Sequence, residues 1–325
     1  MMVTSRRGLA GLSAAALATP ALAQAPRPVA LVVPYAPGGG TDIAAREFAN
    51  GFSAELGGQS VVVDNRAGAA GYVGSLSVAR ARPDGTTLLF AVSTNVVIAP
   101  HLQTGERVVL ADALTPVVQT SSYQYVLVVN PRLNVSTLSE LIALMRSRPR
   151  GSMTFSSSGV GGNNHLAGVL FADALGLPME HVSYRGTAPA LMDVVGGSID
   201  MNFSSPPPAI TLVREGRLKA LAVTGERRMP QLPDTPTLSE AGLPGLVITG
   251  WHGIFAPNGT PDALLERYEA AAKRAIATPR FLERLASEGL EQAPERPRSA
   301  FAAAVKEESA FWARKVPELG LRPTD

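Results

Sequence analysis

The chain of 325 residues contains no cysteine. This absence excludes disulfide bonds and a lipid anchor attached through a cysteine, so the fold depends on its apolar core. A chain of about 300 residues can bury enough apolar surface to be stable without such cross-links. The same length predicts two domains.

The chain also lacks a strong excess of charge, with 29 Lys and Arg against 27 Asp and Glu. Two of the basic residues, Arg6 and Arg7, lie within the first 23 residues, which contain no acid. Subtracting these two from 29 leaves 27 basic residues against 27 acidic ones. No basic stripe stands out, so nucleic acid is not expected as a partner.

No apolar run near the N-terminus is long enough to cross a bilayer. Arg6 and Arg7 precede a short run of small and apolar residues, Gly8 to Ala18, and Pro20 ends it. Ala21-Leu22-Ala23 forms a small-x-small cleavage site, so residues 1–23 are predicted to be a signal peptide, with a membrane anchor as the alternative. The arginine pair fits the general secretory or the twin-arginine route, and we expect a periplasmic protein.

Short apolar runs alternate with helical patterns from Val29 onward, which predicts parallel sheets with helices on their faces. This alternation of strand and helix patterns is repeated after Tyr125, and only helical patterns follow Pro261. Predicted strands are 29–35, 60–64, 86–92, 125–130, 153–156, 181–184, 199–203, 219–224 and 247–256.

Two apolar segments have similar surroundings, because 126–130 and 253–256 are each followed by a proline and then a helix. We interpret them as the strands that cross between two lobes, with ordinary core strands as the alternative. The predicted division is 24–125 plus 250–325 for lobe 1, and 126–249 for an inserted lobe 2.

The stretch from Pro34 to Asp42 joins a strand to a helix through a glycine-rich loop. Backbone N–H groups and the helix dipole suit such a junction to an anion, and glycine allows close approach. Thr41 and Asp42 are expected to cap the helix. No Gly-Lys-Ser/Thr follows, so a phosphate-binding loop of the Walker type is not expected. The alternative to an anion site is a tight turn from strand to helix. The candidate residues are Tyr35, Pro37, Gly38, Gly39, Gly40, Thr41 and Asp42.

A second junction, from Ser156 to Asn164, repeats this logic with hydroxyl and amide side chains. Neutral donors can hold an anion without burying an ion pair. A run so rich in Ser and Gly can also be merely flexible. The candidate residues are Ser156, Ser157, Ser158, Gly159, Gly161, Asn163 and Asn164.

Three further strand ends are polar, and ligands of open α/β sheets bind at such carboxyl ends. Arg185 is the one strong cation among them, and it either pairs with a second carboxylate or lies on the surface. These candidates are Ser93, Thr94, Asn95, Tyr184, Arg185, Gly186, Thr187, Asn202 and Ser204.

No catalytic or metal signature is present. The chain has neither a Gly-x-Ser-x-Gly elbow nor a His-Glu-x-x-His motif, and its four histidines have no short metal spacing. We therefore expect no catalytic residue, no metal and no cofactor. The rival hypothesis is a serine hydrolase that uses Ser157 or Ser158 with His165.

Several motifs resemble those of the Bug, or tripartite tricarboxylate transporter, substrate-binding receptors. The resemblance covers nearly all of the chain after the signal. Its motifs are Pro34-Tyr35-Ala36-Pro37-Gly38-Gly39-Gly40-Thr41-Asp42, Val63-Asp64-Asn65-Arg66-Ala67-Gly68-Ala69-Ala70-Gly71, Arg82-Pro83-Asp84-Gly85-Thr86-Thr87-Leu88, His181-Val182-Ser183-Tyr184-Arg185-Gly186, Leu218-Lys219-Ala220-Leu221-Ala222-Val223-Thr224 and Leu232-Pro233-Asp234-Thr235-Pro236-Thr237.

This resemblance implies an α/β fold of the type II periplasmic-binding kind, with two Rossmann-like lobes joined by two crossover strands. It implies closure of the lobes on a small organic carboxylate held by the 38–42 and 156–164 loops, and we expect the chain to be a monomer. Delivery to membrane transporter subunits is implied, and signalling to a membrane sensor is the alternative.

The chain departs from the family pattern at two places. Ser204-Ser205-Pro206 stands where relatives often carry Phe-Asp-Asn, which weakens the case for an amino-acid ligand, since its ammonium group would need an acid. Gly40 replaces a common Ala or Ser, which is expected to loosen the loop slightly.

Overall fold

The computed structural model describes residues 27–103, 107–319 and 321. The predicted signal peptide, residues 1–23, lies outside the described residues. Across the described part of the chain, no helix combines the length and the apolar character needed to cross a bilayer.

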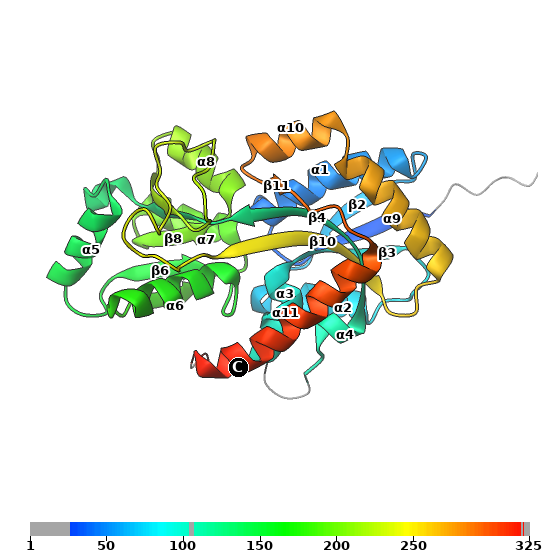
Figure 1. Cartoon of the computed structure of the whole chain (residues 1–325), viewed down its shortest axis with the longest axis horizontal. Coiled ribbons are helices and arrows are strands. Elements are labelled where there is room, and N and C mark those ends of the chain that lie inside the picture. The colour runs from blue at the N-terminus through cyan, green and yellow to red at the C-terminus, as the bar shows by residue number, and fades with distance from the viewer. Residues whose placement is uncertain (1–26, 104–106, 320, 322–325) are drawn as a thin grey trace, which may run out of the picture.

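Two sheets form two lobes that lie side by side (Figure 1). Lobe 1 contains the six-stranded sheet, in the order β11-β4-β10-β3-β1-β2, and lobe 2 the five-stranded sheet, in the order β7-β6-β8-β5-β9. The predicted two-lobed α/β fold is confirmed. The strands of lobe 1 are β1 (Val29–Val33), β2 (Val61–Asn65), β3 (Thr87–Val92), β4 (Leu114–Gln124), β10 (Thr249–Pro257) and β11 (Glu291–Gln292). Those of lobe 2 are β5 (Val126–Val129), β6 (Thr154–Ser157), β7 (Glu180–Ser183), β8 (Met201–Ser204) and β9 (Lys219–Val223).

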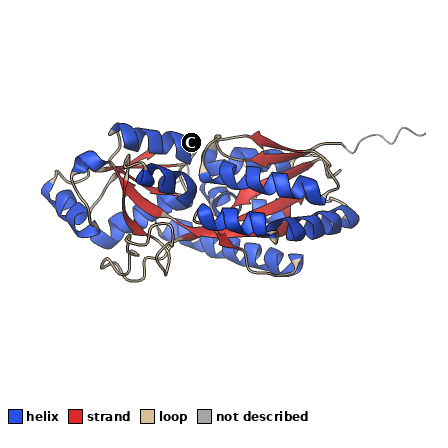
Figure 2. Cartoon of the chain, turned by 90° about the horizontal axis from the view of Figure 1, so that it is seen from above, coloured by secondary structure: helices blue, strands red, loops and turns tan. Residues whose placement is uncertain are grey.

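Helices cover both sheets, and Figure 2 shows them on either side of the strands. Lobe 1 has α1 (Gly40–Glu55), α2 (Tyr72–Ala79), α3 (Ser93–Val97), α4 (Leu110–Ala113), α9 (Asp262–Ile276), α10 (Pro279–Ser287) and α11 (Arg298–Glu318), with short 3-10 turns η1 (Ala69–Gly71) and η2 (Ala99–Leu102). Lobe 2 has α5 (Leu138–Ser147), α6 (Asn163–Leu175), α7 (Thr187–Gly196) and α8 (Pro206–Arg214), with the turn η3 (Pro131–Leu133).

Both sheets have the same pattern of parallel and antiparallel pairing. In lobe 1, β1 runs parallel to β2 and β3, and β10 runs antiparallel to β3 and β4. In lobe 2, β6 runs parallel to β7 and β8, and β5 runs antiparallel to β8 and β9. β1 lies between β2 and β3, and β6 lies between β7 and β8, so the strands that follow each of them in sequence lie on opposite sides of it. Ligands of open α/β sheets bind at such switch points, where the strand order reverses.

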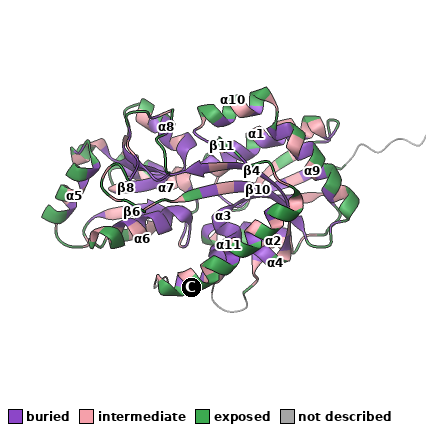
Figure 3. Cartoon of the chain, viewed as in Figure 1, coloured by how far each residue is buried: buried purple, intermediate pink, exposed green. Residues whose placement is uncertain are grey.

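The apolar cores lie between the sheets and their helices, where Figure 3 shows mostly buried residues under exposed helix faces. In lobe 1, the fully buried Phe48 and Phe52 of α1 stack with centroids 5.0 Å apart. Their spacing of four residues places both rings on one face of α1, against Phe90 of β3 and Tyr268 of α9.

The two segments that were expected to cross between the lobes each lie within one lobe. The segments 126–130 and 253–256 were interpreted as crossing strands, but β5 pairs entirely within lobe 2 and β10 entirely within lobe 1. They are apolar because each is a central strand of its sheet, covered on both faces. The chain crosses at Tyr125, between β4 and β5, and returns between β9 and β10 (Figure 1).

The longer of the two missed strands is β4, which is also the longest strand of the described chain; the other is the two-residue β11. The sequence of β4 contains Thr115, Pro116, Gln119 and a run from Thr120 to Ser122, which hides any apolar period. It still pairs along its length with β10, from Leu114 opposite Pro257 to Gln124 opposite Thr249. Burial of both strands stabilises this ribbon despite its polar composition.

Candidate functional site

A small cavity lies where the two lobes meet, at the carboxyl ends of β1, β3, β6 and β8. Its volume of about 20 Å³ is close to what one water molecule needs. Any ligand larger than water must therefore enter with the lobes apart. The lining residues are Tyr35, Gly39, Gly40, Thr41, Val92, Thr94, Tyr123, Tyr125, Ser158, Asn163, Asn164, Thr187 and Ser205.

The structure brings nine of the predicted site residues to this cavity, namely Tyr35, Gly39, Gly40, Thr41, Thr94, Ser158, Asn163, Asn164 and Thr187. Sequence reasoning missed Val92, Tyr123 and Tyr125. Ser205 lies in the predicted polar strand end 202–205, of which only Asn202 and Ser204 were named as site residues. The predicted residues that do not line the cavity are Pro37, Gly38, Asp42, Ser93, Asn95, Ser156, Ser157, Gly159, Gly161, Tyr184, Arg185, Gly186, Asn202 and Ser204.

Three helices whose first residues carry a backbone N–H begin at the cavity wall, since Gly40 starts α1, Asn163 starts α6 and Thr187 starts α7. Each is preceded by a glycine N-cap that offers no side-chain acceptor. The first N–H groups of a helix lack partners within it, and each helix places about half a positive charge at this end. Three such ends from both lobes make the cavity a site for a negative charge.

Asp42 has a different role from the predicted cap. α1 begins at Gly40 with Gly39 as its N-cap, so Asp42 lies within the first turn. Its carboxylate accepts hydrogen bonds from the Gly38 N–H at 3.0 Å, from Arg46 Nε at 2.9 Å and from Asn65 Nδ2 at 2.9 Å. Burial alone would raise the pKa of Asp42, but these donors and the Arg46 charge hold it below its usual value. Asp42 thus fixes the glycine loop from behind.

The second predicted loop reaches from lobe 2 into lobe 1. The Asn163 N–H donates to Thr94 Oγ1 at 3.1 Å, and the Asn163 side chain donates to Ser93 Oγ at 3.0 Å. On the lobe 2 side, Ser158 Oγ donates to Asn164 Oδ1 at 3.1 Å. The loop is ordered by these bonds, and it is not the loose Ser/Gly run that was the alternative.

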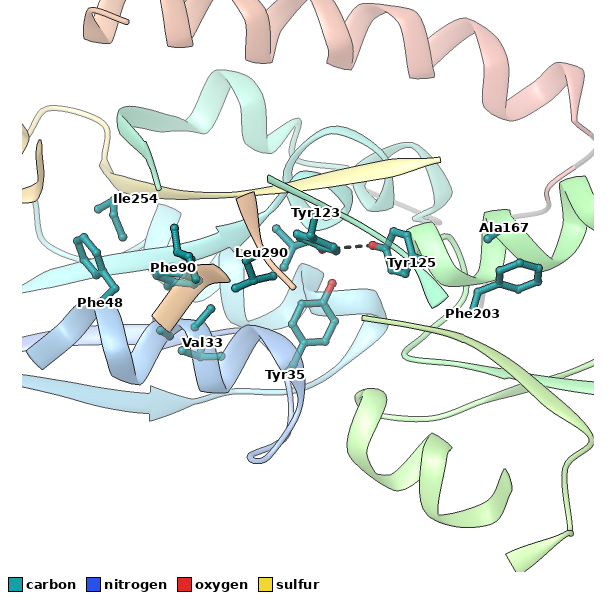
Figure 4. Packing of buried hydrophobic residues seen from close by; sticks show 14 of the residues in the cluster. Val33, Tyr35, Phe48, Phe90, Tyr123, Tyr125, Ala167, Phe203, Ile254 and Leu290 are labelled. Carbon is teal, nitrogen blue, oxygen red and sulfur yellow. Dashed lines mark hydrogen bonds between the residues drawn. The ribbon is translucent and has the colours of Figure 1, made fainter. Parts of the chain in front are cut away.

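Tyr35, Tyr123 and Tyr125 line the cavity on the side of lobe 1 and of the crossing between β4 and β5. Figure 4 shows their rings close together. Tyr35 OH donates to the carbonyl of Ala70 at 2.9 Å, while the hydroxyls of Tyr123 and Tyr125 are 3.2 Å apart. Burial raises the pKa of all three phenols, that of Tyr125 to about 12. They are therefore neutral hydrogen-bonding groups at any physiological pH.

None of the thirteen lining residues carries a charged side chain. Arg185, the one predicted cation, is exposed, and its contribution to the lobe interface is its backbone carbonyl, which accepts from the Ala36 N–H at 3.1 Å. Tyr184 donates to Asp193 and also stays outside the lining. The cavity is thus positive only through helix dipoles and N–H groups.

Three predicted residues, Asn202, Ser156 and Ser204, form hydrogen bonds near the cavity without lining it. All three are fully buried. The Asn202 side chain donates to the carbonyl of Ser156 at 2.8 Å and to its Oγ at 2.9 Å, which joins β8 to β6. Ser204 Oγ donates to the carbonyl of Ser205 at 2.9 Å.

The hydrolase hypothesis depended on Ser157 or Ser158 with His165, and the structure does not pair them. His165 Nδ1 accepts from the Gly161 N–H at 3.0 Å, while Ser157 Oγ lies 2.7 Å from His181 Nε2. Ser157 is fully buried outside the cavity lining. Burial lowers the pKa of His165 to about 3, with the nearby His181 as a smaller cause, and it lowers the pKa of His181 to about 4. Neither imidazole lines the cavity.

Within residues 27–103 and 107–319, no three His, Asp or Glu side chains come together as a metal site. The donors around the cavity are hydroxyls, amides and backbone N–H groups. These suit a carboxylate or another oxyanion rather than a metal ion.

A family model described as "Tripartite tricarboxylate transporter family receptor" matches residues 44–321. The chain belongs to this family. The match confirms the resemblance seen in the sequence. A relative from Pseudomonas sp. (strain P51), the UPF0065 protein in the tcbD-tcbE intergenic region, is 37% identical over 322 residues, covering 97% of this chain and 95% of the relative.

Solved structures of receptors agree with the fold. The periplasmic binding protein BugD is 32% identical with a TM-score of 0.86, covering 91% of this chain and 99% of BugD. Rpa4515 of R. palustris, solved with adipate, is 30% identical with a TM-score of 0.86, covering 92% and 99%. MatC (Rpa3494) of Rhodopseudomonas palustris, solved with bound malate, is 31% identical with a TM-score of 0.83, covering 89% and 98%.

Proposed function

We propose that this chain is a periplasmic receptor that binds a small organic carboxylate between its lobes and catalyses no reaction. The main support for this proposal is that the N-termini of α1, α6 and α7 meet at one cavity whose lining has only neutral side chains. Two solved structures about 30% identical to this chain contain adipate and malate, both carboxylates, which supports the same ligand class here.

The proposed mechanism is hinge closure. Residues 24–125 with 250–325 move as one lobe, and residues 126–249 as the other. A charge-assisted hydrogen bond contributes about 1.5–3 kcal/mol, and micromolar affinity requires about 8 kcal/mol net. A handful of such bonds from the two loops is therefore sufficient after the cost of ordering the lobes.

The closed receptor then delivers the acid to the membrane subunits of a tripartite tricarboxylate-type transporter. We propose that the chain reaches the periplasm through its N-terminal signal, by the general secretory or the twin-arginine route, and acts as a monomer. The family supports this role, since its model is that of the transporter's receptor.

A thermal-shift screen of mono-, di- and tricarboxylates tests the ligand class. Adipate, malate, citrate and benzoate are suitable first probes, each paired with its uncharged amide. We expect at least one acid to raise the melting temperature and its amide to leave it unchanged. If no acid raises it, or if the amides raise it equally, carboxylate binding is contradicted.

A further inference from the structure

Gly40 and Ser205 face one another across the boundary between the lobes. A Cβ atom built on Gly40 would lie 2.5 Å from Ser205 Oγ and 2.8 Å from Ser205 Cβ. Gly40 is not among the glycines with positive φ, so its backbone would accept any residue. The glycine is therefore required by its neighbour in the other lobe and only when the lobes are together.

The Ser205 hydroxyl has no partner within the described part of the chain. The residue is 8% exposed, its Oγ makes no hydrogen bond, and it lines the cavity. It is the N-cap residue of α8, yet its side chain caps no N–H group of that helix. A buried hydroxyl without a partner costs about 1–3 kcal/mol, which a ligand atom at this position would recover.

The start of α8 makes this hydroxyl unusual among the donors of the site. Pro206, Pro207 and Pro208 occupy the first three positions of the helix and have no N–H group. The helix dipole still points its positive end at the cavity, but the first turn supplies no backbone donor there. On this wall the donor that faces the cavity is the Ser205 side chain.

We propose that Gly40 and Ser205 are a matched pair that determines ligand choice. Ser205 Oγ donates to an oxygen atom of the bound acid, either a carboxylate oxygen or a hydroxyl or keto oxygen beside it. The bare Cα of Gly40 gives that hydroxyl room when the lobes close. This inference rests on the proposed function, because it assigns the contact of one wall with the same bound acid.

Four variants separate the donor role of the Ser205 hydroxyl from the space that Gly40 leaves for it. Ser205→Ala removes the hydroxyl but keeps Cβ, and Gly40→Ala introduces the clash. Ser205→Gly and Gly40→Ala/Ser205→Gly complete a cycle, since glycine removes both clashing atoms. Gly196→Ala is the matched control, because a Cβ there meets no atom within 4 Å.

Binding is measured by calorimetry with malate, adipate and benzoate. Closure is measured as the distance between spin labels on Ser139→Cys in lobe 2 and Glu307→Cys in lobe 1. Both positions are exposed, and the chain has no other cysteine to react.

We expect Ser205→Ala to weaken binding of the best probe about tenfold with an unchanged closed distance. Gly40→Ala should weaken binding at least tenfold and keep the labels at the open distance. The double variant should close again and bind like Ser205→Gly alone, while Gly196→Ala behaves as wild type.

Equal binding by wild type and Ser205→Ala would overturn the donor role. Closure of Gly40→Ala, or strictly additive losses in the double variant, would overturn the pairing. A wild-type chain that binds none of the probes would instead contradict the proposed function itself, and the inference would fall with it.

Discussion

The backbone N–H of Asn163 in lobe 2 donates a hydrogen bond of 3.1 Å to Thr94 Oγ1 in lobe 1. The Asn163 side chain adds a second bond, to Ser93 Oγ at 3.0 Å. Asn163 is the first residue of α6, whose initial N–H groups have no partner within the helix. The junction between α6 and α3 therefore holds the lobes together beside the cavity.

Replacing Thr94 with valine tests this junction. Thr94→Val keeps the shape of the side chain but removes the acceptor, so we expect about tenfold weaker acid binding, which corresponds to about 1.4 kcal/mol. Thr94→Ser should restore most of the affinity because it restores the hydroxyl. Thr211→Val, on the exposed face of α8, is the control. Wild-type affinity in Thr94→Val would show that the bond does not contribute to closure.

Replacing Asp42 with asparagine tests the support of the glycine loop. Asp42 is buried and accepts from Gly38, Arg46 and Asn65. Asp42→Asn should therefore lower the free energy of unfolding by about 2 kcal/mol. Asp64→Asn breaks only an exposed ion pair with Arg66 and should cost less than about 1 kcal/mol. Urea denaturation measures both, and equal losses would contradict the supporting role.

Malate and aspartate differ at one group, a hydroxyl in place of an ammonium. No acid is among the lining residues to pair with the ammonium, and burying an unpaired charge is costly. We expect malate to bind at least tenfold more tightly than aspartate in side-by-side calorimetry. A preference for aspartate would mean that an acid reaches the bound ligand from outside the lining.

Arg185 provides a negative prediction. Its side chain is exposed and outside the lining, while its contact with Ala36 uses only the backbone. Arg185→Ala should leave the affinity for mono- and dicarboxylates within about twofold, well under 1 kcal/mol. A selective loss of dicarboxylate binding would assign the guanidinium to a second carboxylate after all.

Three histidines, the buried His165 and His252 and the partly buried His181, predict how stability depends on pH. Burial lowers the pKa of His165 and His252 to about 3 and of His181 to about 4. Unfolded imidazoles titrate near 6.5, so below that pH the unfolded chain binds more protons than the folded one. The free energy of unfolding should fall between about pH 6.5 and pH 4, by about 1.4 kcal/mol per pH unit for each buried imidazole.

Urea denaturation at pH 8, 7, 6 and 5 measures this effect. We expect little change from pH 8 to 7 and a clear fall from 6 to 5. The fall should be shallower in His252→Gln, which keeps a polar group near Ser121. Equal stability at pH 5 and pH 8 would contradict the lowered pKa of these three side chains in the folded chain.

The sequence predicted the fold well where local signals were strong. The two-lobed architecture was predicted from apolar runs such as those at β1, β3 and β5. One wall of the cavity was predicted from the glycine loop before α1. The prediction failed at β4, because polar residues such as Thr120 and Ser121 are buried there through pairing with β10. Pairing between segments about 130 residues apart leaves no local pattern to recognise.

The same limit applies to the site. Tyr123 and Tyr125 line the cavity only because the chain crosses between lobes at that point. Gly40 was expected to loosen its loop, but its missing Cβ leaves room for Ser205 in the opposite lobe. The two departures from the family pattern therefore lie against each other, a relationship visible only in three dimensions.

The central claim is that the N-termini of α1, α6 and α7 hold a carboxylate between the lobes. A crystal structure of the mature chain with malate or adipate tests it most directly. We predict a carboxylate in the cavity, with its oxygen atoms within about 3.2 Å of N–H or hydroxyl donors at Gly40, Asn164 and Thr187 or of waters bound to them. Density for the acid elsewhere on the molecule, or a carboxylate held by Arg185 instead, would contradict the account.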